Sequence, residues 1–207
     1  MLISLIHPSR GRPQKAYETL LNWSKKSTVD LEHILSLDMD DPYLDEYKSL
    51  FTHYIVNDNG CMVEAANLAA QESKGDILVY LSDDFDCPEN WDSLILAKTL
   101  GFKNWVLKVD DCLQKFSVPI LTIPIMSRSV YKHLGYFWHP LYKSMFVDED
   151  LYWTCKQWLI EAPSLKFPHL HPANGKAKND ETYRRSAKNW GQGKAVFQRR
   201  KSKNFPV

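Results

Sequence analysis

The chain has 207 residues, of which 44% are hydrophobic and 25% are charged, a composition typical of one soluble globular domain with at most a small appendage. No apolar run approaches the roughly 20 residues of a membrane span, and the first residues lack a basic leader and a cleavage site, so we expect neither a membrane protein nor a secreted one. The four cysteines form no C-x-x-C pair, which argues against a zinc knuckle or a disulfide framework and favours a reducing, cytoplasmic location.

The net charge of +1 is unevenly distributed along the chain. Residues 175–207 contain ten Lys and Arg against two acidic residues, whereas residues 1–174 contain 16 against 23. A basic tail of this kind is typical of a surface for phosphates or anionic lipid, including a peripheral membrane contact, and equally of a solvated helix with a frayed end. We therefore expect a domain at 1–174 and a basic helical tail or lid at 175–207.

Apolar strands alternate with amphipathic helices in the first half of the chain. In chain order, the pattern predicts a strand at 2–7, a helix at 13–26, strands at 32–37 and 53–56, a helix at 62–73 and a strand at 76–81. Because parallel strands joined by helices are covered on both faces, the alternation predicts an α/β fold with a mostly parallel central sheet flanked by helices.

The second half is less regular. Strands are expected at 104–109 and 119–127, and Pro124 within the latter favours an edge or bent strand over a central one. A short helix that ends at Gly135, an aromatic loop and a helix at 148–159 are expected to follow.

Polar residues come directly after the predicted strands of the first half. They are Pro8, Ser9 and Arg10 after the first strand, Asp38, Asp40 and Asp41 after the second, Asn57, Asp58 and Asn59 after the third, and Ser82, Asp83 and Asp84 after the fourth. Ligands of open α/β sheets lie in the crevice outside the carboxyl ends of the strands. The pattern therefore predicts one polar site built by four strands.

The fourth strand ends in three acids, Asp83, Asp84 and Asp86. Like charges about 4 Å apart repel by roughly 1 kcal/mol in water and about 4 kcal/mol at the dielectric of a protein surface. One Mg²⁺ or Mn²⁺ ion would offset this repulsion, since such ions take one or two protein carboxylates plus substrate phosphates. The alternative is a surface loop in which Asp86 or Asn90 caps the next helix.

Three stretches carry a family resemblance: LISLIHPSRGRP at 2–13, VNDNGCMVEAANLAAQESKGDILVYLSDDFDCPENW at 56–91, and the pair MSRSVYKHLGYFWHP and FVDEDLYW within 126–153. Together they resemble the GT-A-fold glycosyltransferases of the family-two type. In that family a first strand leads into a Pro-Ser/Thr uridine-binding turn, and a later strand ends in an Asp-x-Asp-like motif followed by Pro and Trp. The resemblance implies transfer of a sugar from a nucleotide-diphosphate donor, with a UDP-sugar expected, to a hydroxyl of a glycan or another acceptor.

The resemblance also implies roles for single residues. Pro8, Ser9 and Arg10 would line the base and ribose, Asp38 would accept a hydrogen bond from the base, and Asn67 would help to hold the diphosphate. The Asp-x-Asp-like motif falls on Ser82, Asp83 and Asp84, which makes Asp84 the metal ligand. Either Ser82 or Asp83 would contact the ribose, and Asp86 lies outside the motif.

An acidic run at 148–150 is the candidate source of the catalytic base. The resemblance places an acid at the start of a helix behind the acceptor pocket and assigns the role to Asp148, with Glu149 and Asp150 as competing choices. Attack on an anomeric carbon needs a base within about 3 Å of the incoming hydroxyl. Acids are also favoured in the first helical turn by the helix dipole, which is the structural alternative.

Two histidines, His169 and His171, alternate in the stretch FPHLHP. On an extended segment both face the same way, so one imidazole can complete a metal site begun by Asp84. The resemblance favours His171, and two surface histidines in a proline-bounded loop are the alternative.

Two further segments are candidates for contacts with the substrates. In the aromatic loop, Trp138 or His139 is expected to line an acceptor pocket, although aromatic residues there also suit a core. In the tail, Arg184, Arg185 or Lys188 is expected to close over the diphosphate, because cationic side chains suit that charge.

The sequence therefore predicts a metal-dependent glycosyltransferase that inverts the anomeric configuration in a single displacement. Two other functions remain open. A nucleotidyltransferase would use the same acids to hold a metal and a nucleoside triphosphate, but it would usually have a Gly-rich phosphate loop after the first strand. A non-catalytic nucleic-acid-binding protein would rely on the basic tail, but the acidic remainder of the chain argues against a specific nucleic-acid partner.

Overall fold

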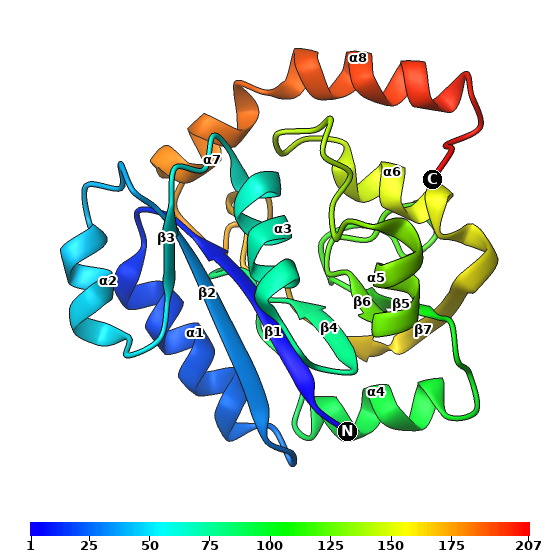
Figure 1. Cartoon of the computed structure of the whole chain (residues 1–207), viewed down its shortest axis with the longest axis horizontal. Helices are drawn as coiled ribbons and strands as arrows, with labels where there is room; N and C mark the ends of the chain where they lie inside the picture. The colour runs from blue at the N-terminus through cyan, green and yellow to red at the C-terminus, as the bar shows by residue number, and fades with distance from the viewer.

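Alternating strands and helices build the first half of the chain in the computed structural model, which describes residues 1–207 (Figure 1). The elements are β1 (Ile3–Ser9), α1 (Pro13–Lys25), β2 (Leu31–Asp38), α2 (Leu44–Leu50), β3 (Ile55–Asn57), α3 (Met62–Glu72), β4 (Ile77–Tyr80) and α4 (Trp91–Thr99). β1 pairs in parallel with β2 and with β4, and β2 pairs in parallel with β3. The carboxyl ends of these strands therefore meet at one edge of the sheet.

The second half adds three strands beyond β4. Its elements are β5 (Val106–Asp110), β6 (Ile125–Ser127), α5 (Arg128–Leu134), α6 (Val147–Thr154), the 3₁₀ turn η1 (Lys156–Trp158), β7 (Leu159–Lys166), the 3₁₀ turn η2 (Pro172–Asn174), α7 (Glu181–Ala187) and α8 (Trp190–Lys201). The strand order is β3-β2-β1-β4-β6-β5-β7, and only β6 runs antiparallel to its neighbours. The predicted α/β fold with a mostly parallel sheet is confirmed.

The strand near Pro124 is central, so the expected edge strand is wrong. β6 begins at Ile125 and lies between β4 and β5. Pro124 has no N–H to donate, but its carbonyl accepts a hydrogen bond from the Tyr80 amide at 2.9 Å. Because the proline immediately precedes the paired residues, the missing donor does not interrupt the ladder.

The sequence patterns did not predict α2 or β7, and the helix expected at 148–159 ends at Thr154. β7 contains Pro163 and pairs only with β5, so it is an edge strand, where proline is tolerated. Its register against β5 shifts after Val109.

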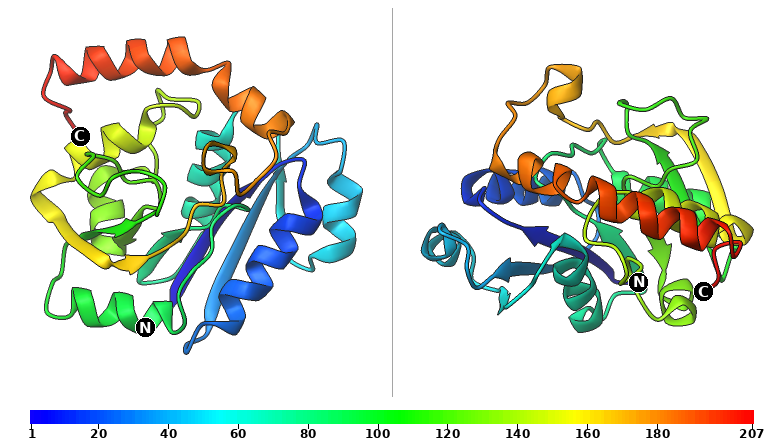
Figure 2. Two further views of the ribbon diagram at one scale, coloured as in Figure 1. Left: turned by 180° about the vertical axis from the view of Figure 1, so that it is seen from behind. Right: turned by 90° about the horizontal axis from the view of Figure 1, so that it is seen from above.

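Side chains of the central strands alternate between two buried layers. Ile6 of β1 and Leu78 of β4 pack with α3, α5, α6 and α8 on one face. Leu5 and Val79 pack on the other face with Trp23 of α1 and with α4, the two helices that Figure 2 (left) shows in front of the sheet. The sheet is therefore covered on both faces by helices, and a ligand can reach it at the edge formed by the carboxyl ends of the strands.

The stretch 175–207 contains α7 and α8, which run across the carboxyl-end side of the sheet (Figure 1). At Gly193, α8 closely approaches the loop before α6, because a Cβ on this glycine would lie 2.3 Å from the Met145 carbonyl oxygen. The Arg200 side chain is buried, and its Nε donates to Asp150 of α6 at 2.6 Å. Part of the positive charge of the tail is thus used for packing. Every helix is too short or too polar to cross a lipid bilayer.

Candidate functional site

A cavity of about 200 Å³ lies at the carboxyl ends of β1, β2 and β4. Most of the residues expected to bind a donor line it, namely Pro8, Ser9, Arg10, Asp38, Ser82, Asp83 and Asp84. The remaining wall comes from Arg12, from Tyr80 of β4, from the start of α3, from Lys143 and Ser144, and from α7 with Asn189. The strand-end pattern of the sequence therefore locates this cavity.

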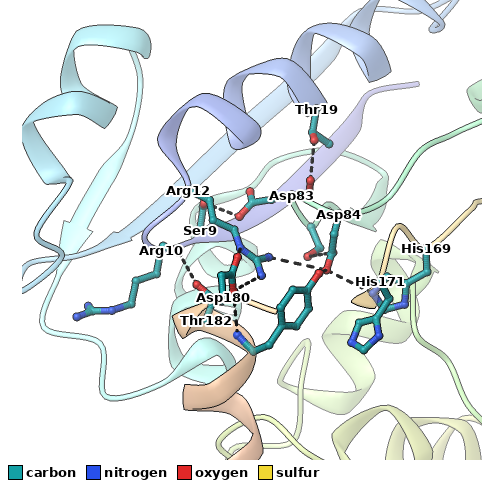
Figure 3. A network of polar contacts seen from close by, with 12 residues as sticks. Ser9, Arg10, Arg12, Thr19, Asp83, Asp84, His169, His171, Asp180 and Thr182 are labelled. Carbon is teal, nitrogen blue, oxygen red and sulfur yellow. Dashed lines mark hydrogen bonds and ion pairs between the residues drawn. The ribbon is translucent and has the colours of Figure 1, made fainter. Parts of the chain in front are cut away.

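Asp84 is buried and faces the cavity with several polar partners (Figure 3). Its Oδ2 accepts a hydrogen bond from the Tyr183 hydroxyl at 2.7 Å and lies 3.4 Å from His169 Nε2, and its Oδ1 accepts from Ser82 Oγ at 2.7 Å. Burial opposes ionisation, but these hydrogen bonds and the adjacent imidazole outweigh it and lower the pKa of Asp84 well below its usual range. The residue is therefore a carboxylate at neutral pH.

Asp83 points toward β1. Its Oδ1 lies 2.8 Å from His7 Nε2, and its Oδ2 accepts a hydrogen bond from Ser9 Oγ at 2.9 Å. Ser9 in turn pairs with the Tyr47 hydroxyl at 2.6 Å. This buried network holds the end of β4 against β1 and so fixes the position of the neighbouring Asp84.

A second charged group lies around Asp38 at the end of β2. Arg10 Nη1 donates to Asp38 Oδ2 at 2.9 Å, and Arg185 of α7 approaches the same oxygen at 3.9 Å. Burial raises the pKa of Asp38, although its hydrogen bond and its attraction to Arg10 act in the opposite direction. Arg10 also pairs with the exposed Asp40.

The two histidines expected near the metal are placed differently. His169 stacks on Phe85 with ring centroids 4.1 Å apart and presents Nε2 to Asp84, whereas His171 Nδ1 accepts a hydrogen bond from the Ala173 amide. Asp84 is therefore closer to His169 than to the favoured His171. No three His, Cys, Asp or Glu side chains form a complete metal-binding group.

A carboxylate and an imidazole nevertheless converge at Asp84 and His169. This pair fits a divalent ion that takes its other ligands from a diphosphate, since Mg²⁺ and Mn²⁺ sites use few protein carboxylates and imidazole also suits transition metals. Asp84 and His169 are thus the residues that would hold the ion.

The acids at 148–150 have three different environments. Asp148 is half-buried at the start of α6, and its Oδ1 accepts a hydrogen bond from the Glu149 amide at 3.0 Å. Burial raises the pKa of Asp148 to about 6. Burial and the charges of Asp84, Asp83 and Asp148 raise the pKa of Tyr80, which lines the cavity. Asp148 is therefore close enough to this wall of the cavity for its charge to act on Tyr80.

Asp150 belongs to the packing of α6 instead. It is 1% exposed, and its Oδ2 accepts from Arg200 Nε and from the Tyr142 hydroxyl at 2.8 Å, while Oδ1 accepts from Thr154 Oγ1 at 3.2 Å. Both carboxylate oxygens of Asp150 accept hydrogen bonds, and the residue does not line the cavity. Asp150 is therefore not placed to accept a proton from a substrate, although the sequence made it a competing choice for the base. Glu149 is half-buried, and burial raises its pKa.

Asn67 does not reach the cavity, contrary to its expected role at the diphosphate. Its Oδ1 accepts hydrogen bonds from the amides of Phe137 and Trp138 at 2.9 and 2.8 Å, and its Nδ2 donates to the Trp138 carbonyl at 2.7 Å. The side chain therefore fastens α3 to the aromatic loop.

We expect Asn67→Ala to lower the free energy of unfolding by about 2–3 kcal/mol, because it leaves buried amides without an acceptor. Urea denaturation measures this loss, and calorimetric titration with UDP measures binding. Unchanged stability combined with weaker UDP binding would restore the original assignment of Asn67.

The aromatic loop also departs from expectation. Trp138 is 2% exposed and packs edge-on against Tyr80, and neither Trp138 nor His139 lines the cavity. The loop contributes Lys143 and Ser144 instead. Packing of the large aromatic side chains into the core is favoured by the apolar area that they bury.

Of the three cationic residues proposed for a lid, only Arg185 lines the cavity. Arg184 pairs with Glu181 on the exposed side of α7, and Lys188 lies 3.9 Å from the same carboxylate. The structural alternative, in which the side chain of Asp86 or Asn90 caps α4, is not observed. Asp86 binds Lys26 Nζ at 2.6 Å, and the N-cap residue Asn90 makes no side-chain capping bond.

Sequence reasoning did not identify Arg12, Tyr183 or His7 as site residues. Arg12 comes two residues after Arg10, in the same segment after the first strand. The strand-end pattern therefore gave a weak indication that Arg12 also belongs to the site. Tyr183 had no sequence signal, because only the return of α7 to the sheet brings it to Asp84. His7 is concealed in an apolar strand pattern.

Comparison with solved structures defines the fold further. The mannosyltransferase PcManGT from Pyrobaculum calidifontis, in complex with GDP-Man and Mn²⁺, matches with a TM-score of 0.67 at 14% identity over 95% of this chain and 64% of its own. S. aureus TarS 1–349 matches with a TM-score of 0.62 at 13% identity over 81% of this chain and 59% of its own. The chain has a GT-A-like glycosyltransferase fold.

The TarS complex with UDP-GlcNAc also matches, with a TM-score of 0.60 at 12% identity over 98% of this chain and 73% of its own. This chain therefore spans less than two thirds of the length of two of these neighbours. No protein-family model and no curated protein matches the sequence. Likeness at this level of identity establishes the fold rather than the family or the activity.

Proposed function

We propose that this chain is a glycosyltransferase that uses a nucleotide-diphosphate sugar, with a UDP-sugar as donor and a divalent cation at Asp84. One observation carries the proposal. The polar cavity lies where β1, β2 and β4 end, in a fold shared with proteins solved in complex with UDP-GlcNAc and GDP-Man. The sequence motif that resembles Asp-x-Asp forms part of its wall at Ser82, Asp83 and Asp84.

The charges of the cavity suggest how the donor is oriented. Asp38 at the end of β2 accepts a hydrogen bond from the base, and Pro8, Ser9 and Arg10 at the end of β1 surround base and ribose. The diphosphate then lies toward Asp84 and His169. A divalent cation at this pair would neutralise the negative charge that develops on the leaving diphosphate.

Asp148 is the base of the proposed reaction. Its carboxylate accepts the proton of the acceptor hydroxyl as the hydroxyl oxygen bonds to the anomeric carbon. The bond from that carbon to the diphosphate oxygen breaks, and the nucleoside diphosphate leaves. A single displacement inverts the anomeric configuration, so NMR of the product tests this step, and retained configuration would contradict it.

The proposed function is tested by a thermal-shift panel of nucleotide sugars with and without Mn²⁺. A ligand that binds only the folded state raises its stability according to the ligand's concentration and affinity. We expect UDP-sugars to raise the melting temperature, and more so with Mn²⁺. Donor turnover then has to release a nucleoside diphosphate, whereas release of pyrophosphate would indicate a nucleotidyltransferase.

We expect Asp84→Asn to remove the part of UDP affinity that depends on Mn²⁺, at least about tenfold or about 1.4 kcal/mol. Asparagine keeps the shape of the side chain but loses the charge that attracts the ion. Calorimetric titration of UDP with and without Mn²⁺ measures the difference.

Asp86→Asn is the matched control for this variant. It removes a nearby carboxylate that binds Lys26 and does not line the cavity. Mn²⁺-dependent binding that survives in Asp84→Asn but not in Asp86→Asn would transfer the ligand role to Asp86.

A further inference from the structure

A buried guanidinium lies beside the acidic strand end and has no role in the function proposed above. Arg12 follows β1 and directly precedes α1, and its side chain is 7% exposed and lines the cavity. Its Nη1 lies 3.8 Å from Asp84 Oδ2, and its Cζ lies 4.3 Å from the centre of the Tyr183 ring. Burial of a cation in this position is favourable only when anions offset the loss of hydration.

Asp180 supplies the main anion. Arg12 Nε and Nη2 each donate to one oxygen of the Asp180 carboxylate at 2.8 Å, a two-point contact (Figure 3). This paired arrangement is the one in which guanidinium groups also bind phosphate oxygens. Asp180 comes from the segment before α7, 168 residues away in sequence, and its side chain is 42% exposed.

The cavity offers few other cations for a diphosphate. Arg10 is already paired with Asp38 and Asp40, and Arg185 lies near Asp38 on the nucleoside side. Lys143 is exposed at the rim. Arg12 is therefore the only buried cation of the cavity that adjoins Asp84.

We propose that Arg12 binds the diphosphate of the donor and that the Asp180 carboxylate occupies this cation in the free protein as an internal anion, which the diphosphate displaces. The inference rests on the proposed function and adds a competitor to it. A donor that enters must exchange one bidentate anion for another on the same guanidinium. Asp180 and Tyr183 contact Arg12 and Asp84 in the free protein. Binding of the donor would break these contacts and so release the segment that contains Asp180, Thr182 and Tyr183.

Asp180→Asn tests the competition directly. Asparagine is as good an N-cap as aspartate, so the hydrogen bond from the Tyr183 amide that begins α7 is kept while the charge is removed. We expect the variant to bind UDP and inorganic pyrophosphate about tenfold more tightly, or about 1.4 kcal/mol, with uridine affinity unchanged. Calorimetric titration in Mn²⁺ measures all three ligands.

Two further variants complete the test. Glu181→Gln removes the neighbouring carboxylate, which pairs with the exposed Arg184, and we expect wild-type affinities. Arg12→Lys keeps the charge but loses the two-point geometry, and we expect weaker binding of UDP and pyrophosphate with uridine unaffected. Circular dichroism and thermal unfolding confirm that each variant is folded.

The outcomes separate this inference from the function on which it rests. If uridine and UDP bind but their affinities are the same in wild type, Asp180→Asn and Arg12→Lys, the inference is wrong and the nucleotide site stands. If UDP, pyrophosphate and uridine bind to none of these proteins, both the proposed UDP-sugar function and the inference are wrong.

Discussion

Asp148→Asn is expected to lower the turnover number for sugar transfer by about 10²- to 10⁴-fold, the usual contribution of a positioned general base. Asparagine cannot accept the acceptor's proton, but it preserves the size of the side chain at the start of α6. UDP affinity should not change, because Asp148 does not line the cavity in which we propose that UDP binds. Single-turnover transfer assays and calorimetric titration with UDP measure the two quantities separately.

The pH dependence of the wild-type reaction provides an independent check on Asp148. Burial raises the pKa of this carboxyl group to about 6, and a base has to be ionised to accept a proton. The transfer rate should therefore fall as the pH decreases through about 6 and level off above about 7. A rate that stays constant between pH 5 and 8 would exclude Asp148 as the base.

The free energy of unfolding should depend on pH in the opposite direction to the transfer rate, because ionisation of Asp148 destabilises the folded state. The raised pKa means that the folded state holds this proton up to about pH 6, whereas an unfolded chain releases it near pH 4, so stability falls as the pH rises between these values. Above pH 7, Asp148→Asn should raise the free energy of unfolding by about 1–2 kcal/mol, after allowance for partial exposure to solvent.

Glu149→Gln is the matched control for Asp148→Asn. It makes the same change at the next residue of the same helix, and we expect transfer to continue. If Glu149→Gln abolishes transfer and Asp148→Asn does not, the base is Glu149.

Except for α2, the first half of the fold was predictable because its signals are local. Alternating apolar strands and helices at 2–81 set the parallel sheet and its carboxyl-end site without long-range information. β6 was misjudged because a proline within a run suggests an edge, whereas here Pro124 falls just before the paired residues. β7 had no clear signal, since an edge strand with Pro163 has neither a continuous apolar run nor strict alternation.

The candidate site shows the same division. Residues at or just beyond the carboxyl ends of strands, such as Ser9 and Asp84, could be placed from sequence, because the sheet brings strand ends together. Asn67 was misjudged because an amide on a helix is suited both to a ligand and to two backbone amides, and only packing decides between them. Arg12 and Asp180 could not be paired in advance, because their contact depends on where the last helices return.

The acidic strand end shows how packing divides charges that look alike in sequence. Asp83 contacts His7, Asp84 lies near Arg12, and Asp86 binds Lys26. The repulsion expected among the three acids is therefore offset in part by separate protein partners. Asp83 and Asp84 both line the cavity, but the two oxygens of Asp83 contact His7 and Ser9 of β1, whereas Asp84 lies beside His169. We therefore propose Asp84, rather than Asp83, as the residue that binds a ligand.

Arg200→Met is expected to lower the free energy of unfolding by about 3–5 kcal/mol, the usual cost of breaking a buried ion pair. Arg200 Nε lies 2.6 Å from Asp150 Oδ2, and the two side chains are 7% and 1% exposed. Methionine fills much of the volume but leaves the Asp150 carboxylate buried without its charged partner. Urea denaturation at pH 7 measures the loss, and Arg199→Met, at the exposed neighbouring position, should change stability by less than about 0.5 kcal/mol.

A double-mutant cycle with Asp150→Asn tests whether the cost arises from the unpaired charge. If it does, Arg200→Met combined with Asp150→Asn should recover part of the stability that Arg200→Met alone removes, because no buried charge is then left without a partner. Additive losses would mean that α8 is held by its apolar contacts rather than by this pair. The same Asp150→Asn protein, assayed under conditions where it is folded, should still transfer sugar, because Asp150 contacts Arg200 of α8 and we propose Asp148, not Asp150, as the base.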